Sequence, residues 1–233
     1  MNNKLTKLST QKDDFLSQVS HELRTPMTSI RSFSEILQSD RILNKKQLQY
    51  FSTIINDESQ RLTRLLDEIL DLSFLESGQV KLNLSNANLS TVLQTALQST
   101  QQAVFNANAK INVNIDWIEN TLNTDVDRLS QVFINLITNA VKYNNKEHPE
   151  LQISGKKTNG NLNVMFHDNG PGIPKSEQPI IFEKFTKLSN ATTTSGVGLG
   201  LAISQEIMKN LGGSLTCLDS EDGAKFLVTM PIA

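Results

Sequence analysis

Apolar residues in the first third of the chain recur at steps of three and four, which is the spacing of one helical face. In the first run they are Leu16, Val19, Leu23, Ile30, Phe33 and Leu37, and in the second Leu48, Phe51, Ile55, Leu62, Leu65, Ile69 and Leu72. We therefore predict one helix that ends at about Gln38 and another over about 45–76. Glu58 is the one polar residue in the second repeat.

Residues 39–44, SDRILN, form only a short connection, so the two helices should make an antiparallel hairpin. A lone hairpin leaves part of its apolar stripe in contact with water. Pairing two hairpins into a four-helix bundle would cover that stripe, and we therefore predict a homodimer. Residues 1–14 are mostly polar and either extend the first helix or fray.

One histidine lies opposite the apolar stripe of the first helix. At about 100° per residue, His21 points about 170° away from the centre of the stripe. Thr25 follows one turn later on the same face, and Glu22 lies to the side, within reach of the imidazole. Pro26 removes an amide donor, which costs about 3 kcal/mol in a regular helix interior, so we expect the helix to bend here.

After Gly78 the pattern changes to an alternation of strands and helices. Strands are expected over 80–84, where Val80, Leu82 and Leu84 alternate, over 110–117, and in two hairpins, 151–167 turning at Asn159-Gly160 and 214–231 turning near Asp222-Gly223. Helices are expected over 89–107, 125–143 and 198–210. Three helices against one mixed sheet make a two-layer sandwich, so the fold class is α+β: a helical hairpin followed by an α/β sandwich.

The composition excludes several classes of protein. The net charge of −2 gives no basic excess for nucleic-acid binding, and the single cysteine, Cys217, excludes an intrachain disulfide and a cysteine-cluster zinc site. No apolar run approaches the roughly 20 residues of a membrane span, and the polar start is unlike a signal peptide. We expect a cytoplasmic location, with any membrane anchor or sensor part outside this sequence.

Asparagines mark one flank of the helix expected over 125–143. Asn135 and Asn139 are four residues apart, and Lys142 and Tyr143 follow one turn later. Carboxamide oxygens are suitable ligands for Mg²⁺, and a lysine can hold a phosphate. The alternative is a surface helix whose asparagines merely face water.

Two glycine clusters follow. In HDNGPGIP, Gly170 and Gly172 permit a sharp turn after Asp168, whose carboxylate could accept a hydrogen bond from an amine such as that of adenine. In SGVGLGLAIS, Gly196, Gly198 and Gly200 lead into a helix whose free amides suit a phosphate, although no strand immediately precedes them as in a dinucleotide fingerprint. The alternative for the first cluster is an ordinary turn.

The segment between these glycine clusters, Lys175–Ser195, is long and ends in a polar run. Phe182 and Phe185 could anchor it as a mobile lid over a nucleotide, and the alternative is a disordered loop. We interpret His148 and His167 as structural or solvated residues without a chemical role, and Cys217 as a partly buried packing residue.

Taken in order, the motifs SHELRTP, NLITNAVKY, DNGPG, IFEKF and GVGLGL resemble those of the sensor histidine kinases of bacterial two-component systems. The resemblance covers about Phe15–Ala233. It implies a dimerisation and histidine phosphotransfer domain at 1–76, a linker and first strand at 77–88, and a catalytic ATP-binding domain of the Bergerat fold at 89–233. ATP and Mg²⁺ would be the cofactors, and a response-regulator receiver domain and a second copy of the chain the protein partners.

The resemblance also implies roles for single residues. His21 would attack the γ-phosphate through its ε nitrogen, Glu22 would fix the imidazole tautomer and take the proton, and Thr25 would orient water for dephosphorylation of the regulator. Asp168 would hold the adenine amine, and Asn135 and Asn139 would position Mg²⁺. The other cofactor-binding residues would be Lys142, Tyr143, Gly170, Gly172, Phe182, Lys184, Phe185, Gly196, Gly198, Gly200 and Leu201.

Three functions stay open on the sequence. The first is a histidine autokinase, the second a degenerate scaffold or phosphatase that binds ATP, and the third a purely structural helical bundle. ATP-hydrolysing members of the wider Bergerat group have a glutamate at the position of Asn135, and asparagine is a poor general base, which favours phosphoryl transfer over hydrolysis. An arginine often occupies the position of Lys184, so the lid residue that contacts the γ-phosphate is not identified. The signal, the cognate regulator, and whether phosphorylation is in cis or in trans are not encoded.

Overall fold

The computed structural model describes residues 2–39, 42–115, 121–158, 160–188 and 197–232, with side chains from residue 13 onward. The chain divides into two compact units, Met1–Asp71 and Leu72–Ala233. None of the helices in the described ranges is long and apolar enough to cross a membrane.

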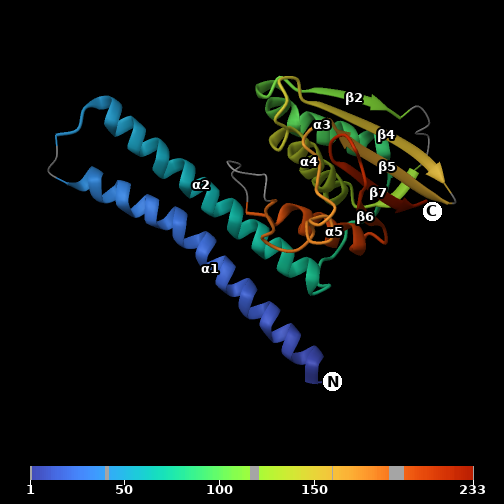
Figure 1. Cartoon of the computed structure of the whole chain (residues 1–233), viewed down its shortest axis with the longest axis horizontal. Coiled ribbons are helices and arrows are strands. Elements are labelled where there is room, and N and C mark those ends of the chain that lie inside the picture. Colours follow the sequence, from blue (N-terminus) through green and yellow to red (C-terminus); the bar gives the residue numbers. More distant parts are fainter. Residues whose placement is uncertain (1, 40–41, 116–120, 159, 189–196, 233) are drawn as a thin grey trace. The chain divides into compact units, whose positions relative to one another are not determined.

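The first unit is built from two antiparallel helices (Figure 1), as the apolar repeats predict. α1 spans Asn2–Gln38, so the polar start extends the helix, and α2 spans Lys45–Glu76. α2 begins with a capping box: Asn44 Oδ1 accepts a hydrogen bond from Gln47 N at 2.9 Å, and Gln47 Oε1 accepts one from Asn44 N at 3.0 Å. This reciprocal pair explains why the helix starts directly after the connection.

The apolar stripes of α1 and α2 meet, but one hairpin does not cover them. Phe33 stacks on Phe51 with ring centroids 5.4 Å apart, and Leu65 is only 2% exposed. In contrast, Leu16 of the first stripe is 50% exposed and Leu48 of the second is 43% exposed. Apolar surface of this extent supports the predicted dimer, which stays a prediction.

The second unit is a two-layer sandwich of the predicted α+β class. Its five-stranded sheet has the order β2-β4-β5-β7-β6, in which β2 and β4 are parallel and the other neighbours antiparallel. The strands are β2 Lys110–Asn114, β4 Glu150–Thr158, β5 Asn161–Asp168, β6 Ser214–Leu218 and β7 Lys225–Pro231. The helices α3 Leu89–Asn106, α4 Val126–Lys142 and α5 Gly200–Asn210 pack on the sheet (Figure 1). The packed core includes Phe133 and Phe166, whose ring centroids are 5.1 Å apart.

The first strand differs from the prediction. Residues 80–84 are not a strand; β1 is Ser85–Asn88, and it pairs antiparallel with β3 Thr121–Thr124, which the sequence pattern did not indicate. The prediction of a single sheet was therefore wrong, because β1 and β3 form a separate two-stranded sheet. The strand prediction for 80–84 rested on the alternation of Val80, Leu82 and Leu84, but Leu84 is half exposed and does not belong to the core. The strand expected over 110–117 ends at Asn114, and Trp117 lies outside the described residues.

Asp125 connects the start of α4 to the segment before β1. Its Oδ1 accepts a hydrogen bond from Arg128 N at 3.1 Å, which caps the helix, and its Oδ2 accepts one from Asn83 N at 2.9 Å. Asp125 is 7% exposed, so both amides would lose their partner without gaining full access to water if the carboxylate were removed.

We predict that Asp125→Ala lowers the free energy of unfolding by about 2 kcal/mol, from a lost helix cap and a second lost hydrogen bond. The matched control is Asp127→Ala, which removes an exposed carboxylate two residues later in the same helical turn and should change stability by less than about 0.5 kcal/mol. Urea unfolding followed by far-UV circular dichroism measures both. Equal effects of the two substitutions would contradict this role of Asp125.

Candidate functional site

Asp168 lies at the end of β5, and its carboxylate is fixed by backbone amides. Its Oδ1 accepts hydrogen bonds from Gly170 N at 2.8 Å and Ala224 N at 3.0 Å, and its own amide donates to Ala224 O at 3.0 Å. No group in the described part of the chain donates a hydrogen bond to Oδ2. The arrangement therefore orients the carboxylate and leaves one oxygen as an acceptor for a ligand.

Glycines allow the backbone of two neighbouring turns to come close to Asp168. At Gly223, which has φ +73°, an added Cβ would lie 1.7 Å from the carbonyl oxygen of Asp168. At Gly170 an added Cβ would lie 2.9 Å from Asp168 Oδ1. Gly172 also has a positive φ, +73°, which a side chain would disfavour. Gly170 and Gly172 were predicted from the sequence, whereas the part played by Gly223 was not.

Burial raises the pKa of the Asp168 carboxyl above its ordinary value of 3.8. The amides of Ala224 and Gly170 oppose this shift, since they stabilise the ionised form. The raised pKa means that the charge of Asp168 is poorly solvated in the folded protein. A ligand that donates a hydrogen bond to this carboxylate would relieve part of that cost.

The predicted asparagine flank of α4 meets the start of α5. Asn135 Nδ2 donates a hydrogen bond to Ser204 Oγ at 2.9 Å, and Asn139 Nδ2 donates one to Asn135 Oδ1 at 3.4 Å. An added Cβ at Gly200 would lie 2.5 Å from Asn135 Oδ1, so a side chain there would displace the Asn135 carboxamide from this position. The structure thereby brings two motifs together that lie 65 residues apart in sequence, and it adds Ser204, which the sequence did not indicate.

The end of α4 is also connected to the loop after Asp168. Asn144 Nδ2 donates a hydrogen bond to Asn169 Oδ1 at 2.7 Å, and Glu150 N donates one to the same oxygen at 2.8 Å. At the end of α4, Lys142 Nζ lies 5.0 Å from the centre of the Tyr143 ring, a cation–π contact. Sequence reasoning missed Asn144 and Asn169, because an asparagine in a loop carries no pattern that identifies its partner.

The lid motif packs against the glycine loop that precedes α5. Phe182 meets Phe226 edge to face, with centroids 6.5 Å apart. Phe185 has φ +60°, a sparsely populated conformation for a bulky residue, and an added Cβ at Gly198 would lie 2.8 Å from Phe185 C. The Phe182 ring and the backbone at Phe185 therefore hold the described part of the lid, residues 175–188, in place. Residues 189–195 of the expected lid, and Gly196, lie outside the described residues.

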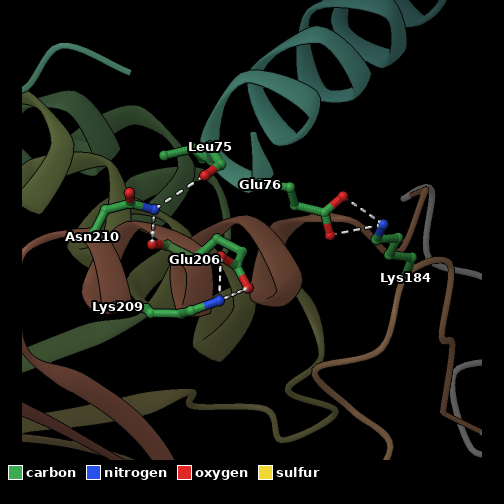
Figure 2. Close-up of polar contacts among 6 residues, drawn as sticks. All are labelled: Leu75, Glu76, Lys184, Glu206, Lys209 and Asn210. Carbon is green, nitrogen blue, oxygen red and sulfur yellow. Dashed lines mark hydrogen bonds and ion pairs between the residues drawn. The ribbon is translucent and has the colours of Figure 1, made fainter. Parts of the chain in front are cut away.

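Lys184 of the lid motif forms an ion pair with the end of α2, as Figure 2 shows. Its Nζ lies 2.8 Å from both carboxylate oxygens of Glu76. Beside this pair, Asn210 Nδ2 donates a hydrogen bond to Leu75 O at 3.3 Å, and Leu72 and Leu75 are 1% and 2% exposed. The last turn of α2 is therefore packed into the second unit. A contact between Lys184 and a phosphate stays a prediction.

In the first unit, His21 is exposed, as its position opposite the apolar stripe predicts. Thr25 Oγ1 donates a hydrogen bond to His21 O at 3.4 Å, which places the hydroxyl one turn from the histidine. Glu22 is partly buried, and its Oε2 lies 3.7 Å from a guanidinium nitrogen of Arg61 on α2. The imidazole is thus accessible on a helix surface, with a carboxylate in the adjacent position.

Other titratable residues have structural surroundings. His167 Nε2 lies 3.3 Å from Ser220 Oγ and also contacts Asp222 O. Burial raises the pKa of the Cys217 thiol to about 11, so it stays protonated and unreactive near neutral pH. The described residues contain no group of three or more His, Cys, Asp or Glu side chains that could hold a metal ion.

Two family models match the chain. Residues 11–78 match the His Kinase A (phospho-acceptor) domain, and residues 124–233 match the family of histidine kinase-, DNA gyrase B- and HSP90-like ATPases. The chain belongs to the sensor histidine kinases. In this histidine kinase core, His21 and Thr25 lie within the phospho-acceptor match, and Asn135, Asp168 and Gly200 lie within the ATPase match.

Curated relatives share the whole core but are longer. The chain is 31% identical over 231 residues to the sensor protein kinase WalK of Staphylococcus aureus (strain MRSA252), covering 95% of this chain and 37% of that protein. It is 33% identical over 217 residues to the sensor protein KdpD of Escherichia coli (strain K12), covering 93% of this chain and 24% of that protein. The chain therefore spans less than two-fifths of either relative.

Solved histidine kinases have the same fold. Histidine kinase AdeS of Acinetobacter baumannii aligns with a TM-score of 0.73 at 23% identity, over 91% of this chain and 98% of that one. Histidine kinase ThkA, in a complex with the response regulator protein TrrA, aligns with a TM-score of 0.76 at 21% identity, over 99% of this chain and 66% of that one.

We predict that Asp168→Asn raises the melting temperature of the kinase core at pH 7. The asparagine keeps an oxygen for both amides and removes the buried charge. Because the pKa of Asp168 is raised, the stability contributed by its protonated form is present below pH 3.8 and lost as the pH rises through the folded-state pKa. The gain should therefore shrink at acidic pH in a melting series.

Asp219→Asn is the control, because the pKa of the Asp219 carboxyl is shifted in the opposite direction. The Lys175 ammonium, 2.9 Å from Asp219 Oδ2, lowers the pKa of that exposed carboxyl. The small contribution of ionised Asp219 to the stability of the fold is present at neutral pH and is lost as the pH falls through the folded-state pKa. The substitution should therefore not raise the melting temperature at pH 7. A lower melting temperature for Asp168→Asn than for wild type at pH 7 would contradict the assigned burial cost.

Proposed function

We propose that the chain is an ATP-dependent protein histidine autokinase that phosphorylates His21 and passes the phosphoryl group to an aspartate of a response regulator. The observation that carries this proposal is the oriented carboxylate of Asp168, which has one free acceptor oxygen in the ATPase-like unit. We assign 1–76 to dimerisation and phosphotransfer, 77–88 to the linker and first strand, and 89–233 to ATP binding and catalysis. The homodimer, a cytoplasmic location and a membrane-anchored full-length protein belong to the same proposal.

The adenine end of ATP would bind at Asp168. Its Oδ2 would accept a hydrogen bond from the exocyclic amine, while the turn through Gly170 and Gly172 brings the backbone close to the base. At the phosphate end, the N-cap residue of α5, Leu199, provides no side-chain hydrogen bond to the first turn. The amides around Gly198, Gly200 and Leu201 are therefore available to phosphate oxygens, and Gly196 would extend the loop.

Mg²⁺ would be held mainly by phosphate oxygens and by Asn135 and Asn139. The residues fit such an ion: Asn135 Oδ1 and Asn139 offer neutral carboxamide oxygens on one helical flank beside the start of α5. When bound, the ion supplies neutralisation of phosphate charge. Lys142 and Tyr143 at the end of α4, and Phe182, Lys184 and Phe185 of the lid, would complete the surroundings of the nucleotide. Full-length ShkA, whose crystal structure is a complex with AMPPNP, has the same fold.

In the transfer step the ε nitrogen of His21 forms a bond to the γ-phosphorus in line with the bond to ADP, which breaks. In its neutral form the imidazole carries a lone pair on this nitrogen, which makes it the nucleophile. Glu22 would accept the proton from the other ring nitrogen. Asn135, being an amide, would not activate water, so ATP would be conserved for the transfer. ThkA forms a complex with a response regulator, and its likeness in fold makes a receiver domain the proposed acceptor here.

The second function is a scaffold or phosphatase that binds ATP without phosphorylating itself. The exposed imidazole of His21 with Glu22 beside it favours the kinase. Dephosphorylation of the regulator is an additional activity that the position of Thr25 supports, because its hydroxyl lies one turn beyond His21 on the exposed face.

The autokinase is tested by incubating the chain with γ-labelled ATP and Mg²⁺. We expect an acid-labile, alkali-stable label on wild type that falls to background in His21→Gln and in Asp168→Asn, since each removes one half of the reaction. His148→Gln is the control and should label like wild type. Bound nucleotide without label on wild type would instead establish the scaffold.

Thr25→Ala tests the phosphatase activity. We expect it to slow dephosphorylation of a receiver domain by about tenfold or more, because a misplaced water reacts slowly, while autophosphorylation stays within about twofold of wild type. Thr28→Ala is the matched control, since Thr28 Oγ1 makes the same kind of helical hydrogen bond, to Arg24 O at 2.8 Å. Equal dephosphorylation rates in wild type and Thr25→Ala would remove Thr25 from this role.

A further inference from the structure

A carboxylate interrupts the apolar stripe of α2. Glu58 occupies a position of the heptad repeat that is otherwise apolar, and its Oε2 is buried without a hydrogen-bond partner in the described part of the chain. The nearest countercharge is on α2 itself: Arg61 Nη1 lies 3.5 Å from this oxygen. Placing a charge here costs stability that leucine or isoleucine would not cost, so a reason other than packing should explain Glu58.

Arg61 connects this carboxylate to the one beside the phosphorylated histidine. Its second terminal nitrogen, Nη2, lies 3.7 Å from Glu22 Oε2 on α1. The side chains of Glu22, Glu58 and Arg61 are 20%, 25% and 32% exposed, so solvent screens these ion pairs only partly. The planar guanidinium carries two terminal nitrogens, which lets one residue hold carboxylates from two helices at once.

We propose that Arg61 is a positioning residue for phosphorylation of His21, acting through Glu22, and that Glu58 holds Arg61 in place. The inference rests on the proposed autokinase function. A glutamate on a helix surface samples several rotamers, and only some bring its carboxylate to the imidazole. By restricting Glu22 to fewer rotamers, Arg61 would raise the rate of His21 phosphorylation.

The competing explanation is that the three charges only fasten α1 to α2. The two explanations make opposite predictions for Glu58→Leu. Leucine at this position removes the desolvation cost of the Glu58 carboxylate, and Arg61 keeps Glu22 as a partner, so its charge is not left unpaired. Glu58→Leu should therefore raise the melting temperature and yet lower the rate of autophosphorylation. A merely structural network predicts that stability and rate fall together.

The decisive experiment is a double-mutant cycle with Arg61→Ala and Glu22→Gln in the whole chain. The rate constant of labelling is measured at saturating ATP, with helical content checked by circular dichroism. We expect Glu22→Gln to slow labelling about 100-fold, Arg61→Ala about tenfold, and the double variant no more than Glu22→Gln alone. Arg61→Lys should fall between wild type and Arg61→Ala, because one ammonium cannot hold both carboxylates.

The ATP concentration that gives half the maximal rate should change less than about twofold in every variant, because ATP binds to residues of the other unit. Arg64→Ala is the matched control: it removes another arginine of α2, whose Nε donates a hydrogen bond to Gln60 O at 3.3 Å, and it should label like wild type.

The outcomes separate the two proposals. Wild type that labels on His21, together with an Arg61→Ala rate equal to wild type, overturns the role of Arg61 and leaves the autokinase intact. Effects of Arg61→Ala and Glu22→Gln that multiply in the double variant also overturn it, because Arg61 would then act independently of Glu22. Wild type that binds ATP without labelling overturns the autokinase, and the role of Arg61 with it.

Discussion

The pairing of β5 with β7 fixes the Asp168 carboxylate, on which the proposed recognition of the nucleotide depends. This pairing brings Ala224 next to Asp168, so one amide and one carbonyl of Ala224 hold the backbone and the side chain of the aspartate together. A shift of register by one residue would turn every side chain of the strand to the other face. Gly223 preserves this register locally, because any side chain there would collide with Asp168. The pairing of β5 with β7 thus determines the direction in which Oδ2 of Asp168 points.

Close backbone approaches at glycines also bring together the residues proposed to bind the phosphates. Gly200 lets the start of α5 lie against Asn135, and Gly198 lets the lid motif lie against the loop before the helix. Each glycine is required by the atoms it approaches, which is a stronger reason than conformational freedom alone. The two ends of the proposed ATP site are joined through α4, whose asparagine flank faces α5 and whose final residues meet the loop after Asp168.

The sequence predicted the elements well where the signal is local. The heptad repeats located α1 and α2, and the Asn-Gly and Asp-Gly turns located both hairpins. It failed for β1 and β3, because SNAN has no apolar alternation and becomes a strand only by pairing with residues far along the chain. The unpaired alternation of Val80, Leu82 and Leu84 was mistaken for that strand.

Within the candidate site, the motif residues were recognisable but their partners were not. Ser204 beside Asn135, Asn144 beside Asn169, and Glu76 beside Lys184 are pairs separated by 25 to 108 residues. A polar side chain on one helix carries no information about which distant side chain it will meet. Glu58 is instructive here, since the sequence marked it as the exception in an apolar stripe, and only the structure connects it through Arg61 to Glu22.

The central claim is that an exposed imidazole of one unit receives the phosphoryl group of a nucleotide bound by the other. The most direct measurement is mass spectrometry at neutral pH, with a fragmentation method that preserves phosphohistidine, on the wild-type chain after incubation with ATP and Mg²⁺. The chain contains three histidines, so the phosphorylated residue can be assigned among three candidates. The account predicts phosphate on the peptide that contains His21. Phosphate on His148 or His167, or on no histidine at all, would contradict it.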